Sequence, residues 1–240
     1  MMKLTLLVDD FVEAEPGFQT GYGFSMLIEL NEKKVLFDTA THPDDLSYNL
    51  NQINMSGNNI DAIFLSHNHN DHTNGLPAIL KDNNDVDIYI HKDWNKRHTF
   101  KGMKIPKKNA KILDKGRQLK EIDKQIYASN SLHSFDYGSI YEHALWIRTE
   151  KNIILITGCC HPGLDDFIND LSNLEISIDR PLTIVGGFHG FKFKNARAEE
   201  VNKNLKNIYP CHCTSHFRKF KKQFGHKCET WGVGRSIEIR

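Results

Sequence analysis

The chain has 240 residues, of which 39% are hydrophobic and 25% are charged, the balance of an ordinary globular protein. Its formal net charge is only +1 at pH 7, so charge gives no case for a dedicated nucleic-acid or membrane-surface binder. No apolar run approaches the length that a membrane span needs. Five cysteines, an odd number, make a poor disulfide framework and favour a reducing cytoplasm.

The first third of the chain predicts mainly strands, with a hairpin near the start. Apolar runs bounded by polar turns indicate the strands, and apolar residues at helical spacing indicate a short helix from about residue 46 to residue 53. Residues 73–81 predict a second helix, with Thr73 as its N-cap. The strands expected here are residues 3–8, 24–30, 34–37, 60–65 and 86–90.

The rest of the chain alternates strands and helices. Residues 92–124 are lysine-rich and weakly patterned, and we expect a helix, a loop and short strands there. Further strands are expected over residues 144–148, 153–157, 182–185 and 208–210, with a final strand pair around Trp231 and Ile237, and helices over residues 164–171, 196–205 and about 214–224. Without a repeat or a linker, this alternation predicts a single domain over residues 1–240. Its expected fold is α/β, with two sheets inside and helices outside.

Seven residues directly after the strand at 60–65 carry the strongest chemical signal, and they read Ser-His-Asn-His-Asn-Asp-His from Ser66. His67 and His69 are two residues apart, so an extended backbone sends both rings to the same side, where one metal ion can bind both. Asp71 and His72 follow where the chain must turn, which lets them reach a second ion. A solvated surface loop needs no paired imidazoles, so we interpret this stretch as a metal motif.

Three later strands also end in small residues and a histidine, namely His161, His189 and His212. Glycines at these strand ends permit the close backbone approach that a crowded site requires. Taken singly, each such histidine is more often structural than metal-binding. A two-metal site needs ligands from distant strands, which favours His161 and His212 as ligands. His189 fits equally well as a member of the ligand shell or as a group that faces the substrate.

The ordered motif His-x-His-x-Asp-His resembles the first metal motif of the metallo-β-lactamase superfamily. Five further segments resemble one branch of it, described as dihydropterin–ribofuranosylaminobenzene phosphate synthase-like. These segments are residues 21–25, 36–39, 157–163, 186–189 and 211–214. The resemblance covers nearly the whole chain, is weakest over residues 92–134, and implies a four-layer αββα sandwich.

The resemblance also implies a dinuclear site that holds two divalent metal ions. By position, one ion would be bound by His67 and His69, the other by Asp71 and His72, with the two shells completed by His161 and His212. Zinc suits such ligands best, although manganese and iron bind similar sets.

One departure from the family pattern concerns the residue after Gly158. Many members have an aspartate there that bridges the two metals, whereas this chain has Cys159. Either Cys159 supplies a thiolate in its place, or the bridge is absent and His161 serves instead. In the first case the third imidazole would lie upstream, and His133 is the alternative ligand.

Two ions that share a water lower its pKa and present hydroxide to an electrophilic carbon or phosphorus. Asp71 would act as the catalytic carboxylate that orients this hydroxide or accepts its proton. Asp38, at a neighbouring strand end, is a candidate partner for a ligand imidazole, and a plain turn aspartate explains it equally well. Lys192 could meet a substrate phosphate, and Trp94 could help to cover an aromatic substrate.

These features predict a metal-dependent hydrolase that acts on a small phosphorylated or heterocyclic metabolite, pterin-related in the family's pattern. The alternatives are an iron-dependent redox protein of the same fold and a non-catalytic metal- or metabolite-binding protein. Diiron relatives use His-x-Glu-x-Asp, and His69 stands where they have glutamate. We expect a small-molecule substrate and no membrane association. Nucleic acid is not expected, because 240 residues leave no room for the RNA-clamping insertion of nuclease relatives, and the oligomeric state is not predicted.

Overall fold

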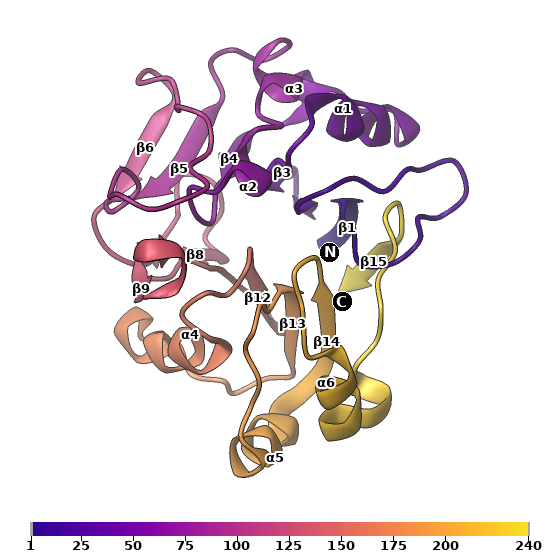
Figure 1. Cartoon of the computed structure of the whole chain (residues 1–240), viewed down its shortest axis with the longest axis vertical. Coiled ribbons are helices and arrows are strands. Elements are labelled where there is room, and N and C mark those ends of the chain that lie inside the picture. The colour runs from indigo at the N-terminus through magenta and orange to yellow at the C-terminus, as the bar shows by residue number, and fades with distance from the viewer. Residues whose placement is uncertain (1, 240) are drawn as a thin grey trace.

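Two β-sheets lie face to face in the computed structural model, which describes residues 2–239 (Figure 1). The first sheet has seven strands in the order β15-β1-β2-β3-β4-β5-β6. Its strands are β1 (Met2–Val8), β2 (Ser25–Leu30), β3 (Lys33–Phe37), β4 (Ala62–Phe64), β5 (Asp87–His91), β6 (Ala110–Leu113) and β15 (Ser236–Ile239).

The second sheet has six strands, in the order β14-β13-β12-β11-β8-β7. Its strands are β7 (Arg117–Gln118), β8 (Ile126–Ala128), β11 (Leu145–Arg148), β12 (Ile153–Thr157), β13 (Leu182–Gly187) and β14 (Leu205–Cys211). A separate antiparallel pair is formed by β9 (Leu132–Ser134) and β10 (Ile140–Glu142). Each strand expected before residue 211 is therefore confirmed, within a few residues at its ends.

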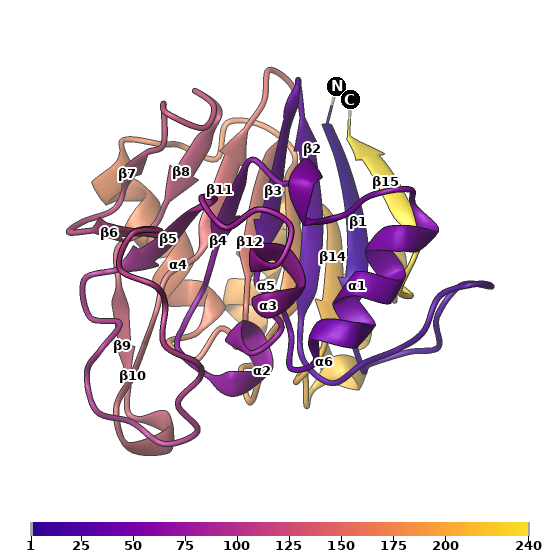
Figure 2. The same cartoon turned by 90° about the horizontal axis from the view of Figure 1, so that it is seen from above.

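Helices cover the outer face of each sheet, as Figures 1 and 2 show. Apolar residues of α1 and α3 pack on the first sheet, and apolar residues of α4, α5 and α6 pack on the second. The helices are α1 (Pro43–Gln52), α2 (Asn70–Thr73), α3 (Pro77–Leu80), α4 (Leu164–Asp170), α5 (Asn195–Asn204) and α6 (Phe217–Phe224). This confirms the predicted αββα layering. Among the described residues, no helix has the length and apolar character that crossing a membrane requires.

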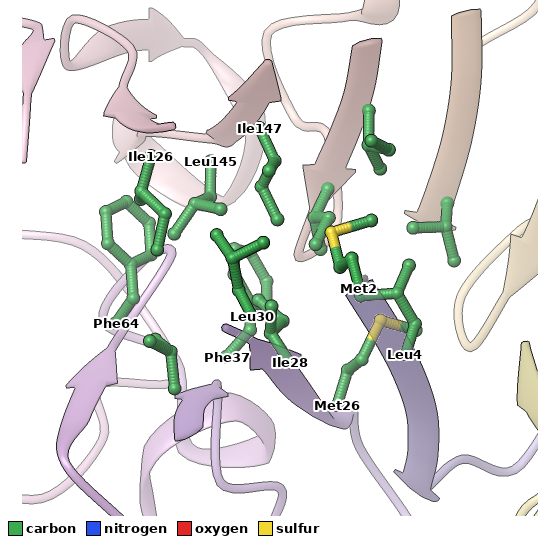
Figure 3. Close-up of a cluster of buried hydrophobic side chains, with 14 of the residues drawn as sticks. Met2, Leu4, Met26, Ile28, Leu30, Phe37, Phe64, Ile126, Leu145 and Ile147 are labelled. Atoms are coloured by element: carbon green, nitrogen blue, oxygen red, sulfur yellow. The ribbon is translucent and has the colours of Figure 1, made fainter. Parts of the chain in front are cut away.

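The main core lies between the two sheets and is built from the inward-facing residues of both (Figure 3). Phe37 and Phe64 of the first sheet stack at a ring distance of 5.5 Å, and Leu145 and Ile147 of the second sheet belong to the same cluster. Because such side chains are fully buried, truncating Phe64 to alanine should cost about 3–5 kcal/mol. The core holds the sheets rigidly together and so fixes the relative position of their strand ends.

The parallel strands of both sheets bring their carboxyl ends to one end of the sandwich. In the first sheet Phe37 pairs with Phe64, and in the second Thr157 pairs with Gly186, which pairs with Pro210. The residues that follow these strands therefore lie at a common edge, as strand ends in parallel sheets do. In Figure 2 this edge is at the bottom of the view, where α2 and the β9–β10 pair also lie.

The predicted helix over residues 73–81 is wrong. The structure has two short helices there, and Thr73 ends α2 instead of capping a helix. Gly75 lies so close to the end of β3 that a Cβ on it would stand 1.8 Å from the carbonyl oxygen of Thr39. Pro77 lacks an N–H and can only begin a new helix. Close packing and proline chemistry therefore divide a segment whose apolar spacing alone suggested one helix.

Two other expectations differ from the structure. Residues 92–124, all of them described, contain β6 and β7 but no helix. The strand pair expected at the end of the chain is β15 alone, because the buried Trp231 lies outside any strand, where its Nε1–H donates to the carbonyl of Arg235. An amphipathic pattern in a polar segment is a weak signal without tertiary packing to support it.

Candidate metal centre

A cavity of about 360 Å³ opens at the edge where the parallel strands end. Its walls come from both sheets and from the segments that follow β5 and β9. The lining residues are Tyr22, His69, Asn70, Asp71, Phe100, Tyr137, Cys159, His161, His189, His212 and Cys213. Imidazoles, a carboxylate and thiols thus converge on one pocket, which they share with the exposed aromatic side chains of Tyr22, Phe100 and Tyr137.

His67, His69 and His161, here called the first triad, offer ligand nitrogens within 4.8 Å of one another. His67 Nε2 and His69 Nδ1 are 3.1 Å apart, and all three rings are buried. Among the described residues, Nε2 of His161 has no hydrogen-bond partner. A buried imidazole nitrogen is costly when unpaired, so three converging rings of this kind fit a metal ion.

Asp71, His72 and His212, here called the second triad, meet the same 4.8 Å criterion beside the first. His212 Nε2 lies 3.3 Å from Asp71 Oδ2, and His72 Nε2 lies 3.8 Å from Asp71 Oδ1. The rings of His67 and His72 are 4.2 Å apart, so the two triads adjoin. Two imidazoles and a carboxylate are ligands that a divalent ion such as zinc accepts.

Most of these imidazoles are held through their second ring nitrogen. The contacts are Ser66 Oγ with His67 Nδ1 at 2.9 Å, Asp38 Oδ2 with His72 Nδ1 at 2.7 Å, Asp136 Oδ2 with His161 Nδ1 at 3.2 Å and Asp10 Oδ1 with His212 Nδ1 at 2.6 Å. Metal-binding histidines characteristically donate their other N–H to such a partner, which sets the tautomer and the ring orientation.

The tautomer of His67 follows from the hydrogen bonds of Ser66. The Ser66 hydroxyl donates its proton to Asp38 Oδ2 at 2.7 Å, so its oxygen must accept the bond from His67 Nδ1–H. That leaves the lone pair of His67 Nε2 directed at the centre of the first triad.

Asp38 serves both triads, because it also accepts the backbone N–H of Ser66 and the Nδ1–H of His72. It is fully buried at the end of β3. Its position favours the interpretation of Asp38 as a partner of a ligand imidazole over that of a plain turn residue.

Three other acidic residues support the site and were missed from the sequence. Asp10 and Asp136 hold His212 and His161 as described above. Glu142, at the end of β10, is fully buried and accepts backbone N–H groups from each residue of the segment 158–161 at 2.8–3.1 Å. Burial raises the pKa of Glu142 to about 7. Asp10 follows the first predicted strand, which is a local signal. Asp136 and Glu142 lie in residues 125–143, for which the sequence predicted no element.

The two triads differ in charge. Burial and the neighbouring imidazoles hold the pKa of His67 well below its usual range and lower the pKa of His69 to about 3. Burial, together with His189, lowers the pKa of His161 to about 4. The first triad is therefore neutral at physiological pH, with its lone pairs free for a metal.

In the second triad, carboxylates outweigh the effect of burial. Burial by itself would lower the pKa of both imidazoles. The carboxylates of Asp71 and Asp38 raise the pKa of His72 instead. Those of Asp10 and Asp71 raise the pKa of His212. Burial would likewise raise the pKa of Asp71, yet His72 and His212 hold it below its usual range. These shifts favour the protonated form of the two imidazoles and the ionised form of Asp71.

Backbone strain is concentrated at the site. Asp38, Cys160, His189 and His212 all have a positive φ, between 40° and 60°, a conformation that costs non-glycine residues about 1–3 kcal/mol. Each lies just past the end of a strand that contributes to the cavity. The chain turns sharply at each of these strand ends. Two of the four residues, His189 and His212, line the cavity, whereas Cys160 belongs to the hydrophobic cluster beneath α4, α5 and α6.

The structure separates the remaining expected site residues. His189 lines the cavity, 4.9 Å from the ring of His161. His133 is exposed and outside the cavity, where its Nε2 contacts Ser139 Oγ at 2.6 Å, so it is not brought to the first triad. Lys192 is also exposed and outside the cavity lining.

The aromatic residues at the cavity differ from those expected. Trp94 is buried against His91, at a ring distance of 5.4 Å, and does not line the cavity. The lining aromatics are instead Tyr22, Phe100 and Tyr137. Phe100 lies in the weakly patterned segment 92–124, and Tyr137 lies in residues 125–143, for which the sequence predicted no element, so no local signal marked either.

Comparison with known proteins shows the family of the chain. A family model described as the metallo-beta-lactamase superfamily matches residues 19–158, more than half of the chain. The chain belongs to this superfamily. Members of it usually bind divalent metals, and the two triads are candidate ligand groups for such ions.

Relatives narrow the comparison within the superfamily. The chain is 28% identical to 7,8-dihydropterin-6-methyl-4-(beta-D-ribofuranosyl)-aminobenzene-5'-phosphate synthase of Methanocaldococcus jannaschii, over 92% of this chain and 89% of the relative. It is 25% identical to the exodeoxyribonuclease WalJ of Streptococcus pneumoniae, over 56% of this chain and 49% of that protein. Among solved structures, Tm1679, described as a metal-dependent hydrolase of the beta-lactamase superfamily, has a TM-score of 0.75 at 23% identity, over 100% of this chain and 99% of that one. This last similarity establishes the fold.

Proposed function

We propose that the protein is a metal-dependent hydrolase with a dinuclear site that acts on a small phosphorylated or heterocyclic metabolite. The observation that carries this proposal is the pair of adjoining triads in one cavity. An arrangement in which buried imidazoles converge, and in which most are held by a partner on the other nitrogen, serves no evident structural purpose and suits two divalent ions.

In this proposal each triad binds one ion. The first ion is bound by His67, His69 and His161, and the second by Asp71, His72 and His212. Zinc is favoured by the nitrogen and oxygen donors, and manganese or iron would bind the same set. The lone pair of His67 Nε2 and the unpartnered Nε2 of His161 support the first position most directly.

Two bound divalent ions would supply Lewis acidity and lower the pKa of the attacking water. The residues of the chain do the remaining work. Asp71 lies on the cavity wall, where its carboxylate orients that water and assists its deprotonation. His189, 3.5 Å from the hydroxyl of Tyr137, faces the same pocket and is placed to donate a hydrogen bond to the substrate.

The substrate class follows from the cavity. A volume of about 360 Å³ suits a small metabolite. Phe100 and Tyr137 contact each other edge to face at 5.4 Å, and both line the cavity. Aromatic walls of this kind suit a planar ring. The name of the synthase relative includes a dihydropterin and a phosphate. We therefore propose a pterin-related or similar phosphorylated heterocycle.

Hydrolysis of bis-(p-nitrophenyl) phosphate by the zinc- or manganese-loaded protein tests the proposal. We expect turnover that requires added metal and is lost in Asp71→Asn, whereas His133→Ala, which changes an exposed histidine outside the cavity, keeps it. A panel with single-stranded DNA, lactones and phosphorylated pterins would separate substrate classes. Absence of turnover on every ester with metal bound would favour a non-catalytic binding protein, and DNA as the best substrate would contradict the small-metabolite class.

A further inference from the structure

We propose that the thiolate of Cys159 bridges the two metal ions and that Cys213 positions it. The proposal rests on the dinuclear site argued above, but it concerns a donor that is additional to the two triads. It would make the centre a mixed nitrogen, oxygen and sulfur site.

The sulfur of Cys159 lies between the two triads. Its Sγ is 3.1 Å from Nε2 of His72, a member of the second triad. The ligand atoms of His67, His72 and Cys159 all lie within 4.8 Å of one another, and His67 belongs to the first triad. A donor that is close to one ligand of each ion is in the position of a bridge.

The segment that carries Cys159 is held rigidly. Glu142 gathers the backbone N–H groups of residues 158–161, including that of Cys159 at 3.0 Å. Gly158 packs so closely on the site that a Cβ would stand 2.1 Å from Ser66 Oγ and 2.9 Å from Asp38 Oδ2. The buried cysteine, with 3% of its surface exposed, therefore has little freedom to point elsewhere.

The charge of the site also favours a thiolate. The two triads contain a single carboxylate, Asp71, so two divalent ions would be neutralised poorly by their direct ligands in a buried place. A coordinating thiol loses its proton outright, because the metal replaces it. The proton leaves to solvent, and the bridge gains one negative charge shared by both ions.

Cys213 is placed to support this thiolate. Its sulfur and the ligand atoms of Cys159 and His212 all lie within 4.8 Å of one another. Among the described residues, Cys213 forms no cluster of this kind with Asp71 or His72. It is therefore to one side of the second triad, on the cavity wall. Its Sγ also lies 3.9 Å from the backbone carbonyl oxygen of Cys159, so the two cysteines are direct neighbours, and a hydrogen bond from a neighbouring thiol to a metal-bound sulfur tunes the ligand.

A sulfur bridge changes the metals that the site prefers. Thiolate is a soft ligand that favours zinc, iron(II) or cobalt, whereas magnesium and manganese prefer oxygen. Zinc should therefore bind this protein more tightly than manganese does, and replacing Cys159 by serine should narrow that difference.

X-ray absorption at the zinc edge of the zinc-saturated protein tests the bridge directly. Zinc–sulfur neighbours lie at about 2.3 Å and nitrogen or oxygen neighbours at about 2.0–2.2 Å. A bridging thiolate neighbours both ions, so we expect about one sulfur per zinc, against about half for a sulfur on one ion only. Cys159→Ser should abolish the sulfur signal. Cys160→Ser is the matched control, because Cys160 is a buried neighbour that belongs to none of the ligand groups.

Cobalt substitution tests the role of Cys213. Cys213→Ser should keep the thiolate-to-cobalt absorption band but shift its energy, and Cys160→Ser should leave the band unmoved. Two zinc ions per chain without any sulfur neighbour would overturn the inference and leave the proposed hydrolase intact. About half a sulfur per zinc, or a sulfur signal lost in Cys213→Ser and kept in Cys159→Ser, would also overturn it. If Cys159→Ser fails to fold, the sulfur count of the unaltered protein decides alone, and a protein that binds no metal would overturn both proposals.

Discussion

The first and second triads lie in one cavity, yet they differ in the charge they carry before a metal binds. The first triad is made of imidazoles only, and burial keeps these neutral. The second contains Asp71, and both of its imidazoles also contact a further carboxylate, Asp38 or Asp10. A neutral imidazole binds a metal without losing a proton, whereas an imidazolium must release one. Two neighbouring ligand groups in one fold can therefore differ in how strongly their affinity for a metal depends on pH.

The largest effect is expected from removing a ligand of the first triad. His161→Ala should lower metal-dependent hydrolysis by more than about 100-fold. Loss of a residue that only hydrogen-bonds to a metal ligand costs up to about 100-fold, and loss of the ligand itself should cost more. It should also reduce the zinc content measured by atomic spectroscopy. His133→Ala should leave both unchanged. A His161→Ala protein that retains two ions per chain would show that the first triad is not a metal position.

Removing the carboxylate behind the second triad should have the next largest effect. Asp38→Asn should lower zinc affinity about 10–100-fold, because the buried carboxylate no longer balances His72. Asp136→Asn should cost less, since the Asp136 side chain is 43% exposed and water can replace it. Chelator competition would measure both affinities. Equal losses in the two variants would show that burial of the supporting carboxylate does not set its contribution to metal affinity.

The pH dependence of zinc binding should separate the two positions. Carboxylates raise the pKa of His72 and His212, so protons compete with the ion there, and affinity for the second ion should rise with pH by up to about tenfold per unit for each proton released. The first triad is already deprotonated, so its affinity should change little between about pH 6 and 8. Calorimetry in buffers of different ionisation enthalpy would count the protons. A steeper response at the first position would reverse the assignment.

The smallest effect concerns Glu142, which holds the segment that carries His161. Burial raises its pKa from 4.5 to about 7 in the folded state. The folded protein thus binds this proton more tightly, and the contribution to stability is present below about pH 4.5 and lost as pH rises through about 7. The free energy of unfolding of the metal-free protein, relative to Glu142→Gln, should fall over that window. Urea unfolding at several pH values measures the difference, and a flat difference would show that Glu142 keeps its ordinary pKa.

The sequence predicted much of the fold. The strands β1, β12 and β13 are marked by the length of their apolar runs, which can be read from the local sequence alone. It failed at residues 73–81, where Gly75 and Pro77 break a helical pattern because of packing against β3. In the polar segment 92–124, where no strong pattern exists, the expected short strands are present but the expected helix is not. Long, strongly apolar elements are specified locally, and short polar ones depend on what they pack against.

The same division applies to the site. Two-residue spacing after a strand is enough to send His67 and His69 to one side, and the turn that follows places Asp71 and His72 beside them. Whether His161 or His133 joins them depends on tertiary packing. Gly158, just after β12, packs against Ser66 and Asp38 at the strand ends of the first sheet, whereas β9 lies in a separate pair. The contact between His212 and Asp10 joins residues 202 positions apart. Local spacing decides which way neighbouring side chains point, but only the packing of two sheets decides which distant ones meet.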